Sequence, residues 1–188
     1  MYKFKISEAE DSLRKYLSEH PQSSDAKKAL DGDPVAMLSI YEKLCGDSEF
    51  EEGAGYDASM IIFEAVTQKH TPAMIRMAEM EMCQGDEYWP EGLDLLYEAA
   101  QLGDGRAKVQ LSNDWYNCAE EWSDAEYQEE NGLNKYQEYS LGFYYLRGIG
   151  VCADERKARA YLLKSSTHGC DEAKKLLAAL DSNEFEQR

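Results

Sequence analysis

The chain has little positive charge: its 188 residues include 20 Lys and Arg against 37 Asp and Glu, which gives a formal net charge of −17. Binding to nucleic acid depends on clustered Lys and Arg at the phosphates, and so acidic a surface repels polyanions and anionic membranes. The sequence therefore predicts no nucleic-acid partner and no membrane partner. A basic protein is the partner that this charge favours.

Long apolar runs are also missing. No stretch reaches the roughly 18 to 20 apolar residues that span a bilayer, and the first 17 residues contain no continuous apolar segment of the kind that leaders carry. The length suits one domain, and an apolar content of 43% is enough to build its core. We expect a soluble, cytoplasmic protein that is monomeric when free.

Groups typical of catalytic and metal centres are scarce. The histidines His20, His70 and His168 stand apart, and the sequence contains no HExxH, GxSxG, CxxC or phosphate-binding glycine loop. We expect no enzyme, no metal and no cofactor, and we expect His168 to contact the last carbonyls of a helix. We expect the five cysteines, at positions 45, 83, 118, 152 and 170, to be free thiols that are wholly or partly buried.

A small-residue pattern recurs along the chain, in which a Gly is followed four residues later by an Ala that opens an apolar helical pattern. Gly103 with Ala107 and Gly169 with Ala173 are two cases. The Ala positions 36, 73, 107 and 173 are separated by 37, 34 and 66 residues, the last interval being long enough for two units. A period of 30 to 37 residues predicts stacked helix pairs.

The last unit is the clearest, and its residues have separate physical roles. Gly142 and Ala158 let two helices approach closely, while Gly148 and Gly150 permit the turn between them. Asp154 is placed to cap the second helix, and Gly169 to supply the left-handed position after its end. The larger side chains that fill the space between the helices are predicted to be Leu141, Tyr145 and Tyr161.

The stretch LGFYYLRGIGVCADERKARAYLLKSSTHG resembles the SEL-one-like repeat family, which is related to the tetratricopeptide repeats. Less regular copies precede it, and the resemblance covers about residues 25 to 180. It implies an all-α fold, a right-handed α-solenoid of about four helix pairs with capping helices at both ends. It also implies a role in protein binding or scaffolding, without a shared catalytic centre.

The repeats divide the single domain 1–188 into units. An N-terminal cap or partial unit, with a helix broken near Pro21, is followed by three degenerate units and the best-matching repeat, and a capping helix with a polar tail ends the chain. The unit 104–136 lacks a recognisable second helix and carries an acidic, aromatic insert. The predicted boundaries are 1–32, 33–69, 70–103, 104–136, 137–169 and 170–188.

Negative charge is concentrated in the middle of the chain. Residues 31–136 contain 24 acidic and 6 basic side chains, whereas the two ends together contain 13 acidic and 14 basic. Such a density costs stability through self-repulsion, so it is either a solubilising surface or one that a partner matches. The runs GDSEFEEGAGYD and CAEEWSDAEYQEENG mix acids with aromatic residues, as a binding site for a basic partner does. The alternative is that Trp122 and Tyr127 cap the core.

Tetratricopeptide geometry suggests which side chains face the concave side. In the last unit it selects Tyr136, Tyr139 and Phe143, and in earlier units the Phe143 position carries Glu42, Glu79 and Asn113. Aromatic rings and carboxylates in one groove can hold a peptide that contains Lys or Arg. With the acidic insert, the predicted partner-binding residues are Glu42, Glu79, Asn113, Tyr116, Glu120, Glu121, Trp122, Asp124, Tyr127, Tyr136, Tyr139 and Phe143.

Three functions remain open at the level of the sequence. The first is an immunity or antitoxin type of inhibitor that covers a basic toxin or effector domain by charge complementarity. The second is a general adaptor or scaffold in signalling or secretion that holds a peptide in its groove. The third is a homo-oligomer formed through exposed edge repeats.

Overall fold

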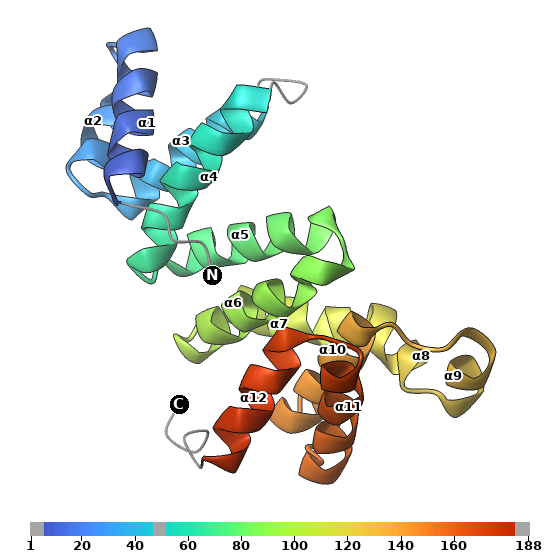
Figure 1. Ribbon diagram of the computed structural model, residues 1–188. Helices are drawn as coiled ribbons and strands as arrows, with labels where there is room; N and C mark the ends of the chain where they lie inside the picture. Colours follow the sequence, from blue (N-terminus) through green and yellow to red (C-terminus); the bar gives the residue numbers. More distant parts are fainter. Residues whose placement is uncertain (1–5, 47–51, 183–188) are drawn as a thin grey trace. The chain divides into compact units, whose positions relative to one another are not determined.

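The computed structural model describes residues 6–46 and 52–182, and these residues form helices without any β-strand (Figure 1). The prediction of an all-α protein is confirmed. The chain divides into two compact units, Met1–Met77 and Ala78–Arg188, and the boundary falls inside helix α5, Thr71–Gln84. Much of the run GDSEFEEGAGYD lies outside the described residues.

The first unit contains four helices before α5: α1 (Ile6–Glu19), α2 (Ser24–Leu30), α3 (Pro34–Gly46) and α4 (Glu52–Thr67). Helices α3 and α4 pack against each other through fully buried apolar side chains such as Ile40 and Ile61, and α1 covers α4. The predicted break near Pro21 separates α1 from α2. Ser23 restarts the helix because its hydroxyl accepts a hydrogen bond from Ala26 N at 3.1 Å.

The described part of the second unit, residues 78–182, contains nine helical segments after α5. Five are regular and longer than two turns: α6 (Trp89–Gln101), α7 (Gly105–Asp114), α10 (Lys135–Arg147), α11 (Glu155–Thr167) and α12 (Asp171–Asp181). The remaining four are short: the 3₁₀ turn η1 (Asp86–Tyr88), the π-helix η2 (Trp115–Ala119), α8 (Glu120–Trp122) and α9 (Ala125–Asn131).

Helices α10 and α11 form the hairpin that the repeat pattern predicts. A Cβ atom on Gly142 would lie 2.7 Å from Leu162 Cγ and 3.2 Å from the Ala158 carbonyl oxygen, so only glycine permits this approach. The turn uses Gly148 at φ 66°. Asp154 caps α11, its carboxylate accepting a hydrogen bond from Lys157 N at 3.0 Å, and these predicted roles are confirmed.

The pair α5 and α6 repeats the close approach with the glycine on the other helix. A Cβ on Gly92 of α6 would lie 2.5 Å from Met82 Cγ and 3.2 Å from the Ala78 carbonyl oxygen on α5. Two hairpins of this unit therefore close through a glycine contact. The repeat signal in the sequence has the same physical basis in both, namely that small residues let the helix backbones approach.

The segment after α7 departs from the hairpin pattern. Helix α7 continues without a break through η2 and α8, and only the two-turn α9 follows before α10. Figure 1 shows α8 and α9 at the outer edge of this unit, beyond α10 and α11. With no long second helix in between, α10 packs directly on α6, where Tyr97 meets Phe143 edge to face at a ring distance of 5.7 Å.

Candidate interaction site

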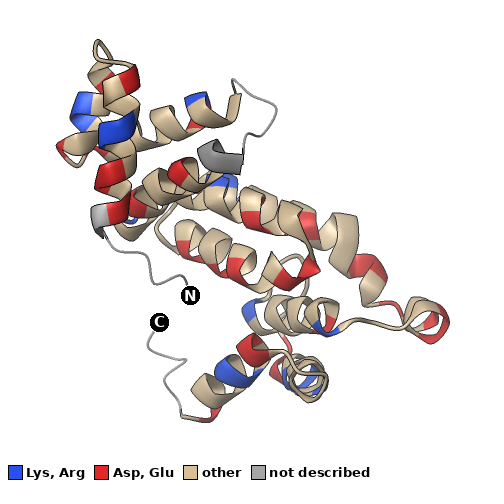
Figure 2. Ribbon diagram, turned by 45° about the horizontal axis from the view of Figure 1, so that its top comes forward, with Lys and Arg blue, Asp and Glu red and all other residues tan. Residues whose placement is uncertain are grey.

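Exposed carboxylates gather on the segment that follows α7. We call residues 115–131, which comprise η2, α8 and α9, the acidic arm. The chain has no Lys or Arg between Lys108 and Lys135, so the arm carries a net charge of −6 (Figure 2). All its carboxylates are exposed and form no ion pair with a described residue: Glu120, Glu121, Asp124, Glu126, Glu129 and Glu130.

Local hydrogen bonds make the arm helical although its sequence lacks an apolar repeat. At its start the Glu120 N–H donates to the Trp115 carbonyl, which closes a turn of π-helix. Further along, Asp124 caps α9, its carboxylate accepting from Glu126 N at 2.8 Å and Tyr127 N at 3.2 Å. The segment 116–136, in which the sequence shows no recognisable second helix, is thus mostly helical.

Aromatic contacts hold the arm to the rest of its unit. Trp115 is 4% exposed and packs edge to face against Tyr144 and Tyr145 of α10. Gly150 makes room for this indole, since a Cβ there would lie 2.4 Å from Trp115 Cγ. At the other end, Gln128 Nε2 donates to the hydroxyl oxygen of Tyr161 at 2.9 Å.

Trp122 and Tyr127, the aromatic residues of the insert, fit both interpretations of the sequence, a cap on the core and a binding surface. Trp122 is half-buried and packs on Trp89 with a ring distance of 5.6 Å, so part of its surface belongs to the core. Tyr127 is also half-buried. Each ring is flanked in sequence by exposed carboxylates, which is the arrangement of an apolar anchor inside an acidic rim.

Two of the predicted partner-binding residues are core residues instead. Tyr139 is 2% exposed and Phe143 is 1% exposed, so neither can line an open groove as predicted. The reason is the direct packing of α10 on α6, which encloses Phe143 between Tyr97 and Tyr144. This packing depends on the missing second helix of the preceding unit and could not be read from α10 alone.

The other predicted residues keep at least part of their side chains accessible. In the second unit, Tyr116 is 62% exposed, Asn113 is exposed, and Tyr136 is half-buried under the Lys135 ammonium group, which lies 4.8 Å from the ring. Glu79 is half-buried, and Glu42 is exposed on the first unit. The structure brings Asn113 and Tyr116 together with the acidic arm, because all of them lie on one continuous helix or directly after it.

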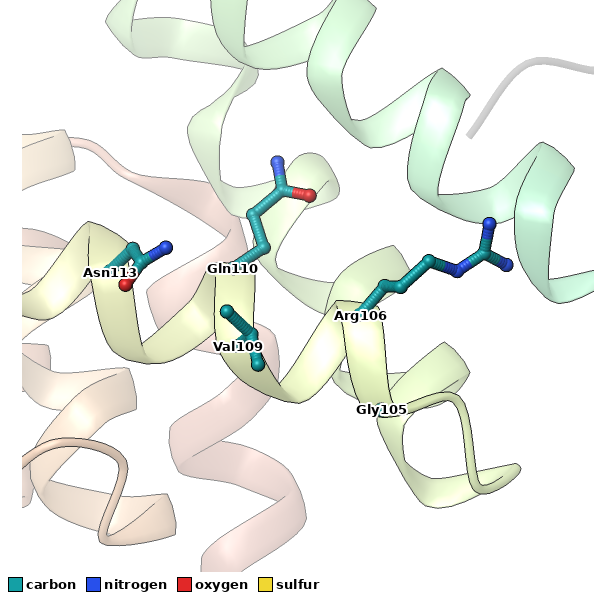
Figure 3. Close-up of a pocket in the computed structure, with 5 residues that line it drawn as sticks. All are labelled: Gly105, Arg106, Val109, Gln110 and Asn113. Carbon is teal, nitrogen blue, oxygen red and sulfur yellow. The ribbon is translucent and has the colours of Figure 1, made fainter.

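A shallow hollow lies on the accessible face of α7. It has a volume of about 480 Å³ and is lined by residues of this helix, of which Arg106, Gln110 and Asn113 are polar and Val109 is apolar (Figure 3). Sequence reasoning selected only Asn113 from this set. The signal that could have found the rest is the seven-residue spacing of Leu102, Val109 and Tyr116, whose side chains are 53%, 60% and 62% exposed.

A pair of buried polar groups marks the junction of α7 and the arm. Burial raises the pKa of Asp114 to about 6, and its Oδ2 atom has no hydrogen-bond partner among the described residues. The Tyr144 hydroxyl, also buried, likewise has no such partner, and its pKa is raised well above the usual range, chiefly by desolvation. Nearby, burial also raises the pKa of the Cys118 thiol. Burial at this junction therefore disfavours the ionised form of Asp114.

A second set of carboxyl groups lies where α5 and α6 approach. Desolvation raises the pKa of Glu81 and of Glu91, and it raises that of Asp94 to about 6 against the opposing effect of Arg147. Because Asp94 nevertheless remains exposed, solvent screening makes its shifted pKa a poor measure of any effect on the stability of the fold. No group of three or more His, Cys, Asp or Glu that could hold a metal ion occurs in the described part of the chain.

The histidine and cysteine expectations need correction. His168 Nδ1 lies 2.8 Å from Glu138 Oε2, so this ring pairs with a buried carboxylate and not with the last carbonyls of α11. All five cysteines are free. Cys170 is buried and two others are half-buried, but Cys83, in the last turn of α5, and Cys152, in the loop between α10 and α11, are exposed.

Comparisons with known proteins find similarity among the solved structures. No protein-family model and no curated protein matches the chain. A Sel1 repeat protein from Oxalobacter formigenes, known from a crystal structure, is similar over 83% of this chain at 22% identity, with a TM-score of 0.40. The match spans 48% of that protein's length. It bears the name of the repeat family that the sequence resembles.

A helix that crosses a membrane must be both long and apolar. Within residues 6–46 and 52–182, no helix meets both requirements.

Proposed function

We propose that this chain is a non-catalytic protein-interaction module whose acidic arm binds a basic protein. Its rings Tyr116, Trp122 and Tyr127 supply apolar contact, and the surrounding carboxylates attract Lys and Arg. The supporting observation is that six exposed, unpaired carboxylates gather in the arm without any Lys or Arg between Lys108 and Lys135, whereas some acids elsewhere, such as Asp25 and Asp57, have Lys partners at 2.5 and 2.6 Å.

The architecture that we propose for this role is a right-handed solenoid of about four helix pairs, arranged as units 33–69, 70–103, 104–136 and 137–169 between two caps. The hairpins closed by Gly92 and Gly142 support stacked helix pairs within the compact unit Ala78–Arg188. A solenoid presents an extended surface and has no enclosed cavity, which suits docking better than turnover of a substrate.

The most concrete form of this function is an immunity or antitoxin type of inhibitor of a basic toxin. An unneutralised negative patch accelerates encounter with a cationic surface, and rapid capture is what neutralising a harmful partner requires. Charge density is the only support for this form. The same chemistry would serve any basic protein that must be bound quickly.

The test is the association rate as a function of salt. The partner is first captured by cross-linking from the source cells and identified by mass spectrometry, and then purified. Association should slow by about tenfold or more between 0.05 and 0.5 M NaCl, because the screening length falls to about 4 Å at the higher salt. The double variant Glu120→Gln/Glu121→Gln should slow association at low salt and flatten the dependence.

A matched control removes the same amount of charge elsewhere. Asp11 and Glu19 are exposed on α1 and form no ion pair among the described residues. The variant Asp11→Asn/Glu19→Gln should therefore leave the association rate nearly unchanged. Equal effects of the two double variants would mean that only total charge matters, and the arm would not be the binding site.

The alternative function is an adaptor that holds a peptide without large electrostatic help. The hollow on α7 and the exposed Val109 favour it, because they offer apolar contact away from the carboxylates. An affinity that does not change with salt, but falls when Val109 is replaced, would support the adaptor over the charge-driven inhibitor.

A further inference from the structure

The uncovered side of the helix formed by α7, η2 and α8 carries regularly spaced apolar groups. Val109 and Tyr116 are 60% and 62% exposed, and their separation of seven positions corresponds to about 10 Å along a helix and nearly two full turns. They therefore lie on about the same side of the helix. We call Val109 and Tyr116 with the hollow beside them the α7 strip.

Polar groups in the α7 strip are available for a ligand. The side-chain amides of Gln110 and Asn113 line the hollow and make no hydrogen bond to a described residue. Each amide offers both a donor and an acceptor, which are the groups that a peptide backbone needs. Figure 3 shows both side chains on α7, with Val109 next to Gln110 and Asn113 further along the helix.

Charge changes along the helix and gives the strip a direction. At its start, the Arg106 guanidinium is held by Asp104, with Nη2 to Oδ2 at 2.8 Å, so its charge is largely satisfied. At its end, Glu120 and Glu121 are exposed and unpaired. A bound segment is therefore drawn by negative charge only at the end that begins the acidic arm.

We propose that the α7 strip takes an extended segment of the partner that carries an apolar side chain followed by Lys or Arg. The apolar side chain would pack on Val109 or Tyr116, the amides of Gln110 and Asn113 would bind its backbone, and the cation would pair with Glu120 or Glu121. This inference rests on the proposed function and specifies which part of the partner makes the contact.

Helix geometry fixes the spacing in the partner. At the rise of a regular α-helix, Val109 to Glu120 would be about 17 Å and Tyr116 to Glu120 about 6 Å, and the π-helix at 115–119 shortens both somewhat. An extended chain advances about 3.3 Å per residue. The cation should therefore follow the apolar residue by about two positions if that residue packs on Tyr116, and by about five if it packs on Val109.

The probe for the test is a phage-displayed library of random 12-residue peptides selected against the full chain. We expect enriched peptides to share an apolar residue with Lys or Arg two to five positions away. Enriched peptides without a basic residue, or without the apolar one, would overturn the proposal. Failure to enrich any peptide would also overturn it.

Variants then locate the binding site of an enriched peptide. Val109→Ser and Tyr116→Ser should each weaken binding by about tenfold, and both side chains are exposed, so the fold is kept. Leu163→Ser is the matched control, since Leu163 is 60% exposed on α11 and should not affect binding. Glu120→Gln/Glu121→Gln should weaken binding and reduce its dependence on salt.

The outcomes separate this inference from the proposed function. If the carboxylate variant weakens binding of the basic partner but Val109→Ser, which lies outside the arm, does not, the arm binds and the α7 strip does not. If light scattering shows a dimer of the wild type that Tyr116→Ser abolishes, the strip is covered by a second copy of this chain. Either result overturns the inference.

Discussion

The α10–α11 hairpin and the helix that runs from α7 into the acidic arm use similar residues for opposite purposes. In the hairpin, Tyr139 and Phe143 are buried and the helices close through Gly142. In the arm, Tyr116 is exposed and the segment is anchored mainly by Trp115. The difference follows from the neighbouring helices: α6 packs on the face of α10 that carries Phe143, whereas Tyr116 stays 62% exposed.

The distribution of charged residues also differs between the two regions. Residues 135–182, which include the hairpin, carry 6 acidic and 8 basic side chains, whereas residues 78–134 carry 15 acidic and 2 basic. A covered face needs no charge to stay soluble, but an accessible face that is partly apolar does. Acids around exposed rings keep such a surface soluble, and in the proposed function they also attract the basic partner.

The largest expected effect is on the hairpin, through Gly142→Ala. The added Cβ would meet Leu162 at 2.7 Å and the Ala158 backbone oxygen at 3.2 Å, and the backbone cannot yield as a flexible side chain can. We expect a loss of about 1–3 kcal/mol of unfolding free energy, measured by urea denaturation. The matched control is Gly105→Ala on α7, where nothing lies within 4 Å of the added atom. If both variants lose the same stability, helix approach does not distinguish the two regions.

A smaller effect of opposite sign is expected at the arm junction, from Asp114→Asn. Burial raises the pKa of Asp114 to about 6 in the folded chain, above its value when unfolded. Burying the ionised carboxylate therefore does not lower the free energy of unfolding below about pH 4. The loss grows between pH 4 and 6 and is complete above about pH 6. The variant should gain about 1–2 kcal/mol over the wild type at pH 7 and nothing at pH 4.

Urea denaturation at the two pH values measures this difference. The control Glu120→Gln alters an exposed carboxylate on the same continuous helix and should change stability little at either pH. An equal gain for Asp114→Asn at pH 4 and pH 7 would show that the carboxyl is not held neutral by burial.

The smallest effect is expected from removing a helix cap in each region. Asp124→Ala removes the cap of α9 and Asp154→Ala that of α11, each normally worth about 1 kcal/mol. Because α11 belongs to the packed hairpin, Asp154→Ala should lower global stability. Asp124→Ala should instead raise hydrogen exchange only within 125–131, without a change in the urea midpoint. A lowered midpoint for Asp124→Ala would mean that the arm unfolds together with the rest of its unit.

Short-range chemistry was readable from the chain alone. The turn at Gly148, the cap at Asp154 and the close approach at Gly142 depend on sterics and hydrogen bonds within one hairpin, and all were predicted correctly. The exposed carboxylates of the arm were also accessible to prediction, because no Lys or Arg near them in sequence could neutralise them.

Burial of individual rings depended on contacts between distant segments. Phe143 is enclosed because Tyr97, 46 residues earlier, lies against it, and the π-helix begins where Trp115 fits against Gly150, 35 residues later. The local sequence pattern does not predict such contacts, because a tyrosine or phenylalanine on a helix face has the same periodicity whether or not a neighbouring helix covers it. Which aromatic residues reach a partner is therefore settled by packing, whereas the presence of helices and their ends is settled by local sequence.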